Sequence, residues 1–554
     1  MGTLDIITVI IFSLAVLATG ISLSKSGKDL KGFFGGGGNI PWAMSGLSLF
    51  MGFFSAGTFV VWGSIAYSCG LTAIIIQLTM AVAGFAVGTF IAPRWHRTGA
   101  LTAAEYITDN FGRGTQKTYT YLFLAVSVFT SGSFLYPVAK ILEVAAGVPL
   151  TVSILALGLF CVIYTSLGGL RGVMVTDVLQ FVILFTAVII AVPLSFGKIG
   201  GVQEFFDRAP KGFFQCFSGE YTPWFIFAFC LYNAVFIGGN WSYVQRYTSV
   251  RTERDAQKVG WLFGALYLIS PILWMLPPMI YRIYNPGLSG LENENAYLLM
   301  CREALPGGLL GLMLGGMIFA TASSLNGTLN ISAGVFTNDI YRRLCPDSSD
   351  RTLIRVARLS TVGFGLLAIV VAMLVKSMGG IVNVVISVAA LTGVPLYLPV
   401  IWSMFSERQT GKTLLASTFI SLAINLFFKF CTPALFGFSL SRGAEMMVGA
   451  LVPAVILAVF EIVQKCRGYV RPEPIRQTRQ ASGETAADEN ANRFTCKVLG
   501  ISIASAGAVV MVLGAVAGEH WTITVAAGII VAAIGLTIFA KSRKRRQQQG
   551  EPIK

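Results

Sequence analysis

The chain has 554 residues, of which 55% are hydrophobic and only 12% carry a charge, and its mean hydropathy is +0.71. A soluble protein of this size carries roughly twice that charged fraction. The composition therefore excludes a soluble globular protein and indicates a polytopic membrane protein. The chain has only two histidines, His96 and His520, which are far apart in the sequence and do not indicate the active site of a membrane enzyme.

Apolar stretches close to the ~20 residues that cross a bilayer recur along the whole chain. They predict fifteen transmembrane helices, at 4–24, 42–69, 73–93, 117–145, 149–167, 174–197, 222–246, 259–284, 308–341, 354–377, 381–404, 412–431, 443–465, 497–517 and 521–541. The first stretch lacks a basic leading region and a clear small-residue cleavage site. We therefore interpret it as a retained helix and not as a signal peptide.

The net charge of +15 has a topological explanation. If the N-terminus lies outside, 32 of the 41 basic residues fall on the inward-facing connections and on the C-terminal tail. The positive-inside rule then predicts a multi-pass protein of the cytoplasmic membrane with a cytoplasmic C-terminus. The basic excess is thus an orientation signal and does not indicate nucleic-acid binding. The basic run at 541–546 is expected to anchor the last helix at anionic headgroups.

Nine cysteines are scattered in or beside the predicted spans, and their spacing indicates neither a disulfide framework nor a metal site. Cys216 and Cys301 both fall on predicted outer loops, so a bond between these two stays open at this stage.

Two predicted spans are interrupted in the same way. The second has Ser-Ala-Gly at 55–57, and the seventh has Gly-Gly-Asn at 238–240. Four uninterrupted spans separate them, so each interrupted span begins a unit of five helices, and the second unit crosses the bilayer in the opposite sense. Such paired interruptions in two inverted halves point to the midplane binding site of a transporter. The alternative is that these glycines only allow close helix packing, as we expect for Gly307, Gly311 and Gly315.

The segment 307–341 carries paired serines in the middle of an apolar helix. Ala320, Ser323 and Ser324 lie at i, i+3 and i+4, so one carbonyl and two hydroxyls share a helical face. Uncharged oxygens of this kind suit a hard cation such as Na⁺. The alternative is that the hydroxyls only bond to the carbonyl one turn back.

Four motifs in chain order resemble those of a known family, the sodium:solute symporters, which include sodium/glucose, sodium/proline and sodium/pantothenate carriers. They are TAAEYITDNFG (102–112), SLGGLRGVMVTDVLQ (166–180), VQRYTSVRTERDAQ (244–257) and LNISAGVFTNDIY (329–341). The resemblance extends from about residue 4 to 466. It implies an all-α membrane fold with an inverted five-plus-five helix repeat (a LeuT-like core), one N-terminal accessory helix and about four C-terminal ones.

This resemblance also implies how the chain is divided. We expect an N-terminal accessory helix and loop at 1–40, the two repeats at 41–200 and 201–405, accessory helices at 406–466, a cytoplasmic polar linker at 467–496, and two accessory helices with a basic tail at 497–554.

The resemblance implies Na⁺ as the coupling ion and a set of residues that would bind it. By position, Ser323 and Ser324 would supply hydroxyls, and Ala320 a carbonyl. Met51 and Phe54 would supply carbonyls from the interrupted first core helix, where side-chain identity matters little. Asp177 would be the nearby carboxylate that supports sodium binding, although as an alternative it caps a helix end.

The predicted solute pocket departs from the family's better-known members. Phe53 stands where sodium/glucose carriers have Asn and the proline carrier has Asp. The Glu, Lys, stacking Tyr and His positions of sugar carriers fall on Gln77, Tyr267, Phe236 and Thr58. An uncharged, aromatic, hydrogen-bonding pocket is therefore expected, and proline is disfavoured. The candidate solute-binding residues are Thr58, Gln77, Phe236, Asn240 and Tyr267.

The sequence thus predicts a sodium-coupled carrier for a small uncharged or zwitterionic solute, with the solute and the lipid bilayer as its partners. It indicates no nucleic-acid partner and no obligate protein partner. A primary pump is disfavoured because the Walker-like string at 406–413 lacks its leading glycine and lies in a short loop. Three alternatives stay open: a proton-coupled carrier, a channel, and a sensor that keeps the fold without transport.

Overall fold

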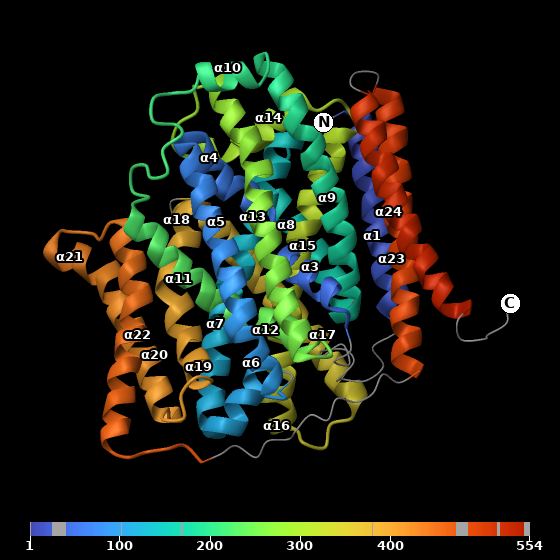
Figure 1. Cartoon of the computed structure of the whole chain (residues 1–554). Helices are drawn as coiled ribbons and strands as arrows, with labels where there is room; N and C mark the ends of the chain where they lie inside the picture. The colour runs from blue at the N-terminus through green and yellow to red at the C-terminus, as the bar shows by residue number, and fades with distance from the viewer. Residues whose placement is uncertain are drawn as a thin grey trace.

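The computed structural model describes residues 2–24, 40–100, 102–167, 170–378, 380–472, 486–517 and 521–547. Within these ranges all regular secondary structure is helical, and the only β-type contacts are two isolated bridges, Ile40 to Val250 and Ser218 to Tyr221. Long helices run side by side between two ends of the molecule (Figure 1). The upper end in this view carries α4 (Gly63–Cys69), α10 (Val202–Asp207) and α14 (Ala296–Ala304), and the lower end carries α6 (Ala92–Arg97) and α16 (Arg342–Leu344).

All fifteen predicted spans coincide with helices. By length and apolar composition, eleven single helices and two bent helix pairs within the described ranges are candidates to cross a membrane. Some of these single helices join two neighbouring elements. The eleven are built on α5 (Leu71–Ala86), α7 (Ala103–Ala146), α9 (Leu170–Ile199), α13 (Glu253–Tyr284), α15 (Leu309–Val335), α17 (Asp350–Leu374), α18 (Ile381–Val388) with α19 (Val394–Ser403), α20 (Gly411–Leu426) with α21 (Thr432–Phe436), α22 (Arg442–Cys466), α23 (Ala486–Ala517) and α24 (Trp521–Gln547). The two remaining spans, α1 (Thr3–Ser24) and α8 (Leu150–Leu167), contain shorter apolar stretches in their described parts.

Both predicted interruptions are present. The second span consists of α3 (Trp42–Phe53) and, after a gap of four residues, a helix from Thr58 to Cys69 at an angle of 58°. The seventh consists of α11 (Pro223–Gly239) and α12 (Trp241–Thr248), which meet at 59°.

Local chemistry explains why these helices stop and restart. At the second break, Asn240 adopts an extended conformation and its Oδ1 accepts a hydrogen bond from the Ser242 amide at 2.9 Å, which caps α12. Gly239 has no room for a side chain, because a Cβ there would lie 2.7 Å from the Tyr397 Cβ. At the first break, the Ala56 amide donates to the Thr321 Oγ1 of α15 at 2.7 Å, so a side chain satisfies a backbone group that the helix leaves open.

Helix α15 lies at the centre of the bundle. Its most apolar window is fully buried, as expected for a helix that is apolar all round, and it packs against α9, α7, α1 and α17. The predicted glycine stripe makes only one very close approach: a Cβ at Gly311 would lie 2.3 Å from the Asp5 carbonyl oxygen. At Gly315 the nearest atom would be 3.9 Å away, and at Gly307 none lies within 4 Å.

The N-terminal accessory helix α1 is joined to α15 by a polar contact that the sequence did not reveal. Asp5 is 2% exposed, and its Oδ1 accepts hydrogen bonds from the Gly308 amide at 2.6 Å and the Gly311 amide at 3.0 Å. Gly308 begins α15 with φ +86° and has no side chain to cap the helix. The carboxylate of α1 therefore caps α15 from a neighbouring helix.

Three expectations need correction or fall outside the described residues. Helix α23 begins at Ala486, so the linker predicted at 467–496 is already helical in its last eleven residues, and residues 473–485 lie outside the described ranges. The backbone of α24 continues through the basic run 541–546, but the side chains that were expected to anchor it are not described beyond residue 542. Cys216 is exposed and Cys301 is buried, and both are free, so these two cysteines are not paired.

Candidate sodium and solute sites

The first break brings four predicted oxygens together. The Ser324 Oγ lies 3.2 Å from the Met51 carbonyl oxygen and 3.3 Å from the carbonyl oxygens of Phe54 and Ala320. Phe54 is in an extended conformation after the last turn of α3, so its carbonyl is not used inside that helix. One hydroxyl carries one proton and donates to one of the three carbonyls at a time, which leaves the other lone pairs available to a cation.

The other two predicted sodium residues form an adjoining pair. The Ser323 hydroxyl donates to Oδ1 of Asp177 in α9, and the Ser48 Oγ of α3 donates to Oδ2 at 2.6 Å. The carboxylate is fully buried. Asp177 therefore bridges the same two helices, α3 and α15, that supply the oxygens around Ser324. Its alternative role as a helix-end cap is not seen, because Asp177 lies within α9 and both its carboxylate oxygens accept side-chain hydroxyls.

This donor set fits a monovalent hard cation. Neutral carbonyl and hydroxyl oxygens are the ligands that such ions prefer, and a single nearby carboxylate matches a single positive charge. The residues come from the end of α3 at the first break and from the unbroken helix α15, so a shift of α3 relative to α15 would separate them.

Three further residues belong to this region and were not singled out from the sequence. Thr321 ties the break to α15 through the Ala56 amide, and Ser48 holds Asp177. Arg246 of α12 is 3% exposed, donates to the Ser242 carbonyl at 2.7 Å and attracts Asp177 electrostatically. The available signals were the VQR motif that contains Arg246 and the position of Thr321 directly after Ala320.

A cavity of about 160 Å³ lies on the other side of the same break. Among the residues that line it, none is charged, and eight are aromatic: Phe53, Trp62, Phe134, Phe229, Tyr232, Phe236, Tyr243 and Tyr267. The polar side chains on its wall are Ser55, Thr58, Gln77, Thr130, Ser133, Asn233 and Thr392. The cavity thus combines aromatic walls with neutral hydrogen-bonding groups.

Four of the five predicted solute-binding residues line this cavity: Thr58, Gln77, Phe236 and Tyr267. Asn240 does not, because its side chain caps α12 and donates to the Tyr397 hydroxyl at 3.2 Å. Gln77 is 2% exposed, and its Nε2 has no hydrogen-bond partner among the described residues. A buried donor without a partner is costly, so this amide is well suited to an acceptor on a bound molecule.

Phe53 changes the character of the wall beside the break. Its ring stacks on Tyr243 with centroids 4.2 Å apart and meets Phe236 edge to face at 5.8 Å. Phe53 is therefore part of an aromatic cluster in the cavity wall.

The sequence matches the family model described as the sodium:solute symporter family over residues 33–420. This chain is a member of that family. A sodium/glucose cotransporter of Vibrio parahaemolyticus is 30% identical to it, over 77% of this chain and 85% of that protein. The sodium/sialic acid symporter NanT of Aliivibrio fischeri is 26% identical, over 81% of this chain and 92% of that protein.

A solved structure supports the fold. The substrate-bound outward-open state of a Na⁺-coupled sialic acid symporter has a TM-score of 0.72 to this sodium:solute symporter, with 23% identity over 84% of this chain and 98% of that one. Membership and fold confirm three predictions: the family itself, an all-α membrane fold with a LeuT-like core, and Na⁺ as the coupling ion.

Proposed function

We propose that this sodium:solute symporter imports a small uncharged organic solute across the cytoplasmic membrane by alternating access, and that it has no enzymatic activity. The observation that carries the proposal is the first break in the bundle. On one side of it the Met51, Phe54 and Ala320 carbonyls surround the Ser324 hydroxyl, and on the other side lies a buried cavity without charged side chains.

The ion is proposed to bind at Met51, Phe54, Ala320, Ser323 and Ser324, with Asp177 as the supporting carboxylate. Bound Na⁺ would hold α3 against α15 and favour the state that accepts solute from outside. When the carrier changes to its inward-open state, α3 and α15 move apart at the break. The oxygens around Ser324 are then separated, and the ion leaves to the cytoplasm. This arrangement makes ion release depend on the same movement that opens the solute cavity inward.

The solute class follows from the cavity wall. An ionised solute would be held without a compensating charge in a buried site, which is costly. Aromatic rings favour a solute with an apolar or planar face, while Gln77, Thr58 and Asn233 offer hydrogen bonds to its edge. An uncharged solute with at least one acceptor oxygen for the Gln77 amide fits best, and a zwitterion fits less well.

The ion gradient supplies enough free energy for accumulation. One positive charge that moves through 100 mV contributes about 2.3 kcal/mol, and a tenfold Na⁺ gradient contributes about 1.4 kcal/mol more. Together they support a solute gradient of several hundredfold for one ion per solute.

We further propose that the N-terminus lies outside and the C-terminus in the cytoplasm. Two of the helices that carry basic residues, α6 and α16, lie at the same end of the molecule in Figure 1, and the positive-inside rule assigns this end to the cytoplasm.

Uptake into proteoliposomes tests the proposal. The purified full chain is reconstituted, and the entry of labelled sugars, polyols, monocarboxylates and neutral amino acids is followed with an inward Na⁺ gradient, with K⁺ in its place, and with an inward proton gradient. We expect saturable entry of one uncharged class with Na⁺ only. Entry that is equal in K⁺, or that a proton gradient drives as well, would contradict sodium coupling, and entry that does not saturate would indicate a channel. No uptake of any uncharged compound would contradict the solute class.

A further inference from the structure

A second cavity lies away from the transport pathway, at the end of the bundle that we assign to the cytoplasm. It has a volume of about 730 Å³ and lies between the kinked start of α7, the start of α20 and the end of α22. Its walls are formed by Phe111, Gly114, Thr115, Thr410, Gly411, Lys412, Thr413, Phe460, Val463, Gln464 and Arg467. None of these residues touches the proposed sodium or solute sites.

Two glycines shape the backbone around this cavity. Gly112 interrupts α7 with φ +79°, so the helix changes direction beside Phe111. Gly411 packs so closely on α7 that a Cβ there would lie 2.3 Å from the Thr115 Oγ1. The two helices therefore approach closely at two residues of the cavity wall.

The wall formed by α22 is amphipathic along its axis. Phe460, Val463, Gln464 and Arg467 are spaced as one face of a helix, with the apolar residues toward the membrane interior and the cation at the helix end. Lys412 adds a second cation from α20. Both Lys412 and Arg467 are exposed, and no acidic residue is among those that line the cavity.

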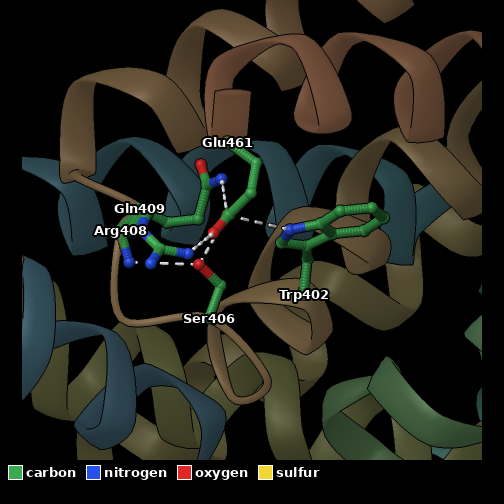
Figure 2. A network of polar contacts seen from close by, with 5 residues as sticks. All are labelled: Trp402, Ser406, Arg408, Gln409 and Glu461. Carbon is green, nitrogen blue, oxygen red and sulfur yellow. Dashed lines mark hydrogen bonds and ion pairs between the residues drawn. The ribbon is translucent and has the colours of Figure 1, made fainter. Parts of the chain in front are cut away.

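Glu461, the carboxylate next to Phe460 in the chain, is engaged by the loop before α20 (Figure 2). Glu461 accepts hydrogen bonds from the Ser406 Oγ at 2.5 Å, the Gln409 Nε2 at 2.9 Å, the Arg408 Nη1 at 3.3 Å and the Trp402 Nε1 at 3.4 Å. These bonds fasten the end of α22 to the loop between α19 and α20 and compensate the charge of Arg408. The Walker-like string is part of this loop and continues into a capping box, Thr410 with Thr413, at the start of α20.

We propose that this cavity binds the headgroup of an anionic phospholipid, with Lys412 and Arg467 on the phosphate and Phe460 and Val463 against the start of an acyl chain. Two cations at one end and apolar side chains at the other match the two halves of a lipid at the level of the headgroups. The Glu461 network holds the two helices that carry these cations at a fixed separation. A free anion would use only the cations, whereas a lipid uses both halves of the wall.

Native mass spectrometry of the purified full chain tests this binding. The probe is phosphatidylglycerol added to delipidated protein in detergent, with phosphatidylcholine of the same acyl chains as the zwitterionic comparison. We expect one phosphatidylglycerol to bind in preference to phosphatidylcholine. The double variant Lys412→Gln/Arg467→Gln should weaken this binding about 30-fold, as expected for two basic side chains near an anionic headgroup.

The matched control is Lys465→Gln/Arg342→Gln, which removes the same charge from exposed cytoplasmic-end residues that do not line the cavity. This control should bind phosphatidylglycerol as the unmodified chain does. The proposal is overturned if both lipids bind equally, if the control loses as much affinity as the cavity variant, or if millimolar inorganic phosphate displaces the lipid, which would show a free-anion site. Because the readout is lipid retention, its failure leaves the proposed transport function untouched.

Discussion

The substitution Ser324→Ala tests the proposed sodium site most directly. It removes a single hydroxyl that lies 3.2 to 3.3 Å from three carbonyl oxygens and leaves those carbonyls in place. Without an ion, that hydroxyl makes one hydrogen bond at a time, so its loss costs the folded protein about 1 kcal/mol. We therefore expect the variant to fold and to insert normally.

The effect on the ion is larger than the effect on folding. A buried interaction with a charged group contributes about 1.5 to 3 kcal/mol. At about 1.4 kcal/mol per factor of ten, the Na⁺ concentration that gives half-maximal uptake should rise about 10- to 100-fold. At saturating Na⁺ the apparent affinity for the solute should be largely restored, because the solute cavity is unchanged. The assay is initial uptake rate in proteoliposomes over a range of Na⁺ at constant ionic strength.

Thr328→Val is the matched control. The Thr328 hydroxyl lies one turn further along α15 and donates only to the Ser324 carbonyl of the same helix, at 3.1 Å. It should leave the Na⁺ dependence within about twofold. If Ser324→Ala changes the Na⁺ dependence no more than this control does, the assignment of the break as the ion site is wrong.

Three other perturbations give separate tests. Gln77→Leu should raise the solute concentration for half-maximal uptake about tenfold while the melting temperature is kept or raised, because the amide donor has no partner in the part of the chain that the structure describes. A lowered melting temperature with unchanged uptake would argue against a solute contact. Gly311→Ala should lower the free energy of unfolding by about 1 to 3 kcal/mol through a clash with the Asp5 backbone. Gly315→Ala should be close to neutral in the same thermal unfolding assay, because its Cβ would meet no close atom. Equal effects of the two substitutions would show that α1 does not pack against Gly311. Burial raises the pKa of Glu294, which lies in the short helix Gly290–Asn295 directly before α14, so the free energy of unfolding should fall as the pH rises above about 4.5, where the unfolded state ionises first. Glu294→Gln should flatten that part of the plot of melting temperature against pH, and an unchanged slope would exclude this residue as the cause.

Features fixed by neighbouring residues in the chain were predictable from the sequence. The two breaks follow from glycines and a helix-capping asparagine within a few residues, and both lie where the sequence placed them. The helix ends are also local: Thr102, Thr222 and Thr252 each cap the helix that follows through a side-chain oxygen. Helices α10 and α14 were not predicted, because they are short, lie in connections between spans and do not carry the long apolar stretch by which a span is recognised.

Features fixed by residues far apart in the chain were not predictable. The Asp5 carboxylate caps a helix about 300 residues away, and nothing in the periodicity of either segment pairs them. The same holds for the Glu461 network and for the attraction between Arg246 and Asp177. Asn240 shows the complementary failure: its position beside a break was predicted correctly, but the rotation of the helix directs its amide to Tyr397 and away from the cavity.

The geometry of the first break separates the proposed ion site from the proposed solute site. The Phe54 carbonyl lies beside Ser324, while the side chains of its neighbours Phe53 and Ser55 line the solute cavity. A backbone carbonyl is present whatever the side chain, so replacing a polar residue by Phe53 alters the cavity wall and leaves the oxygens around the ion unchanged. The proposed ion site therefore depends on backbone conformation and on two serines of α15, and the proposed solute site depends on side chains. Because both proposed sites share one break, any movement that opens one of them would change the other, which would couple ion release to solute release.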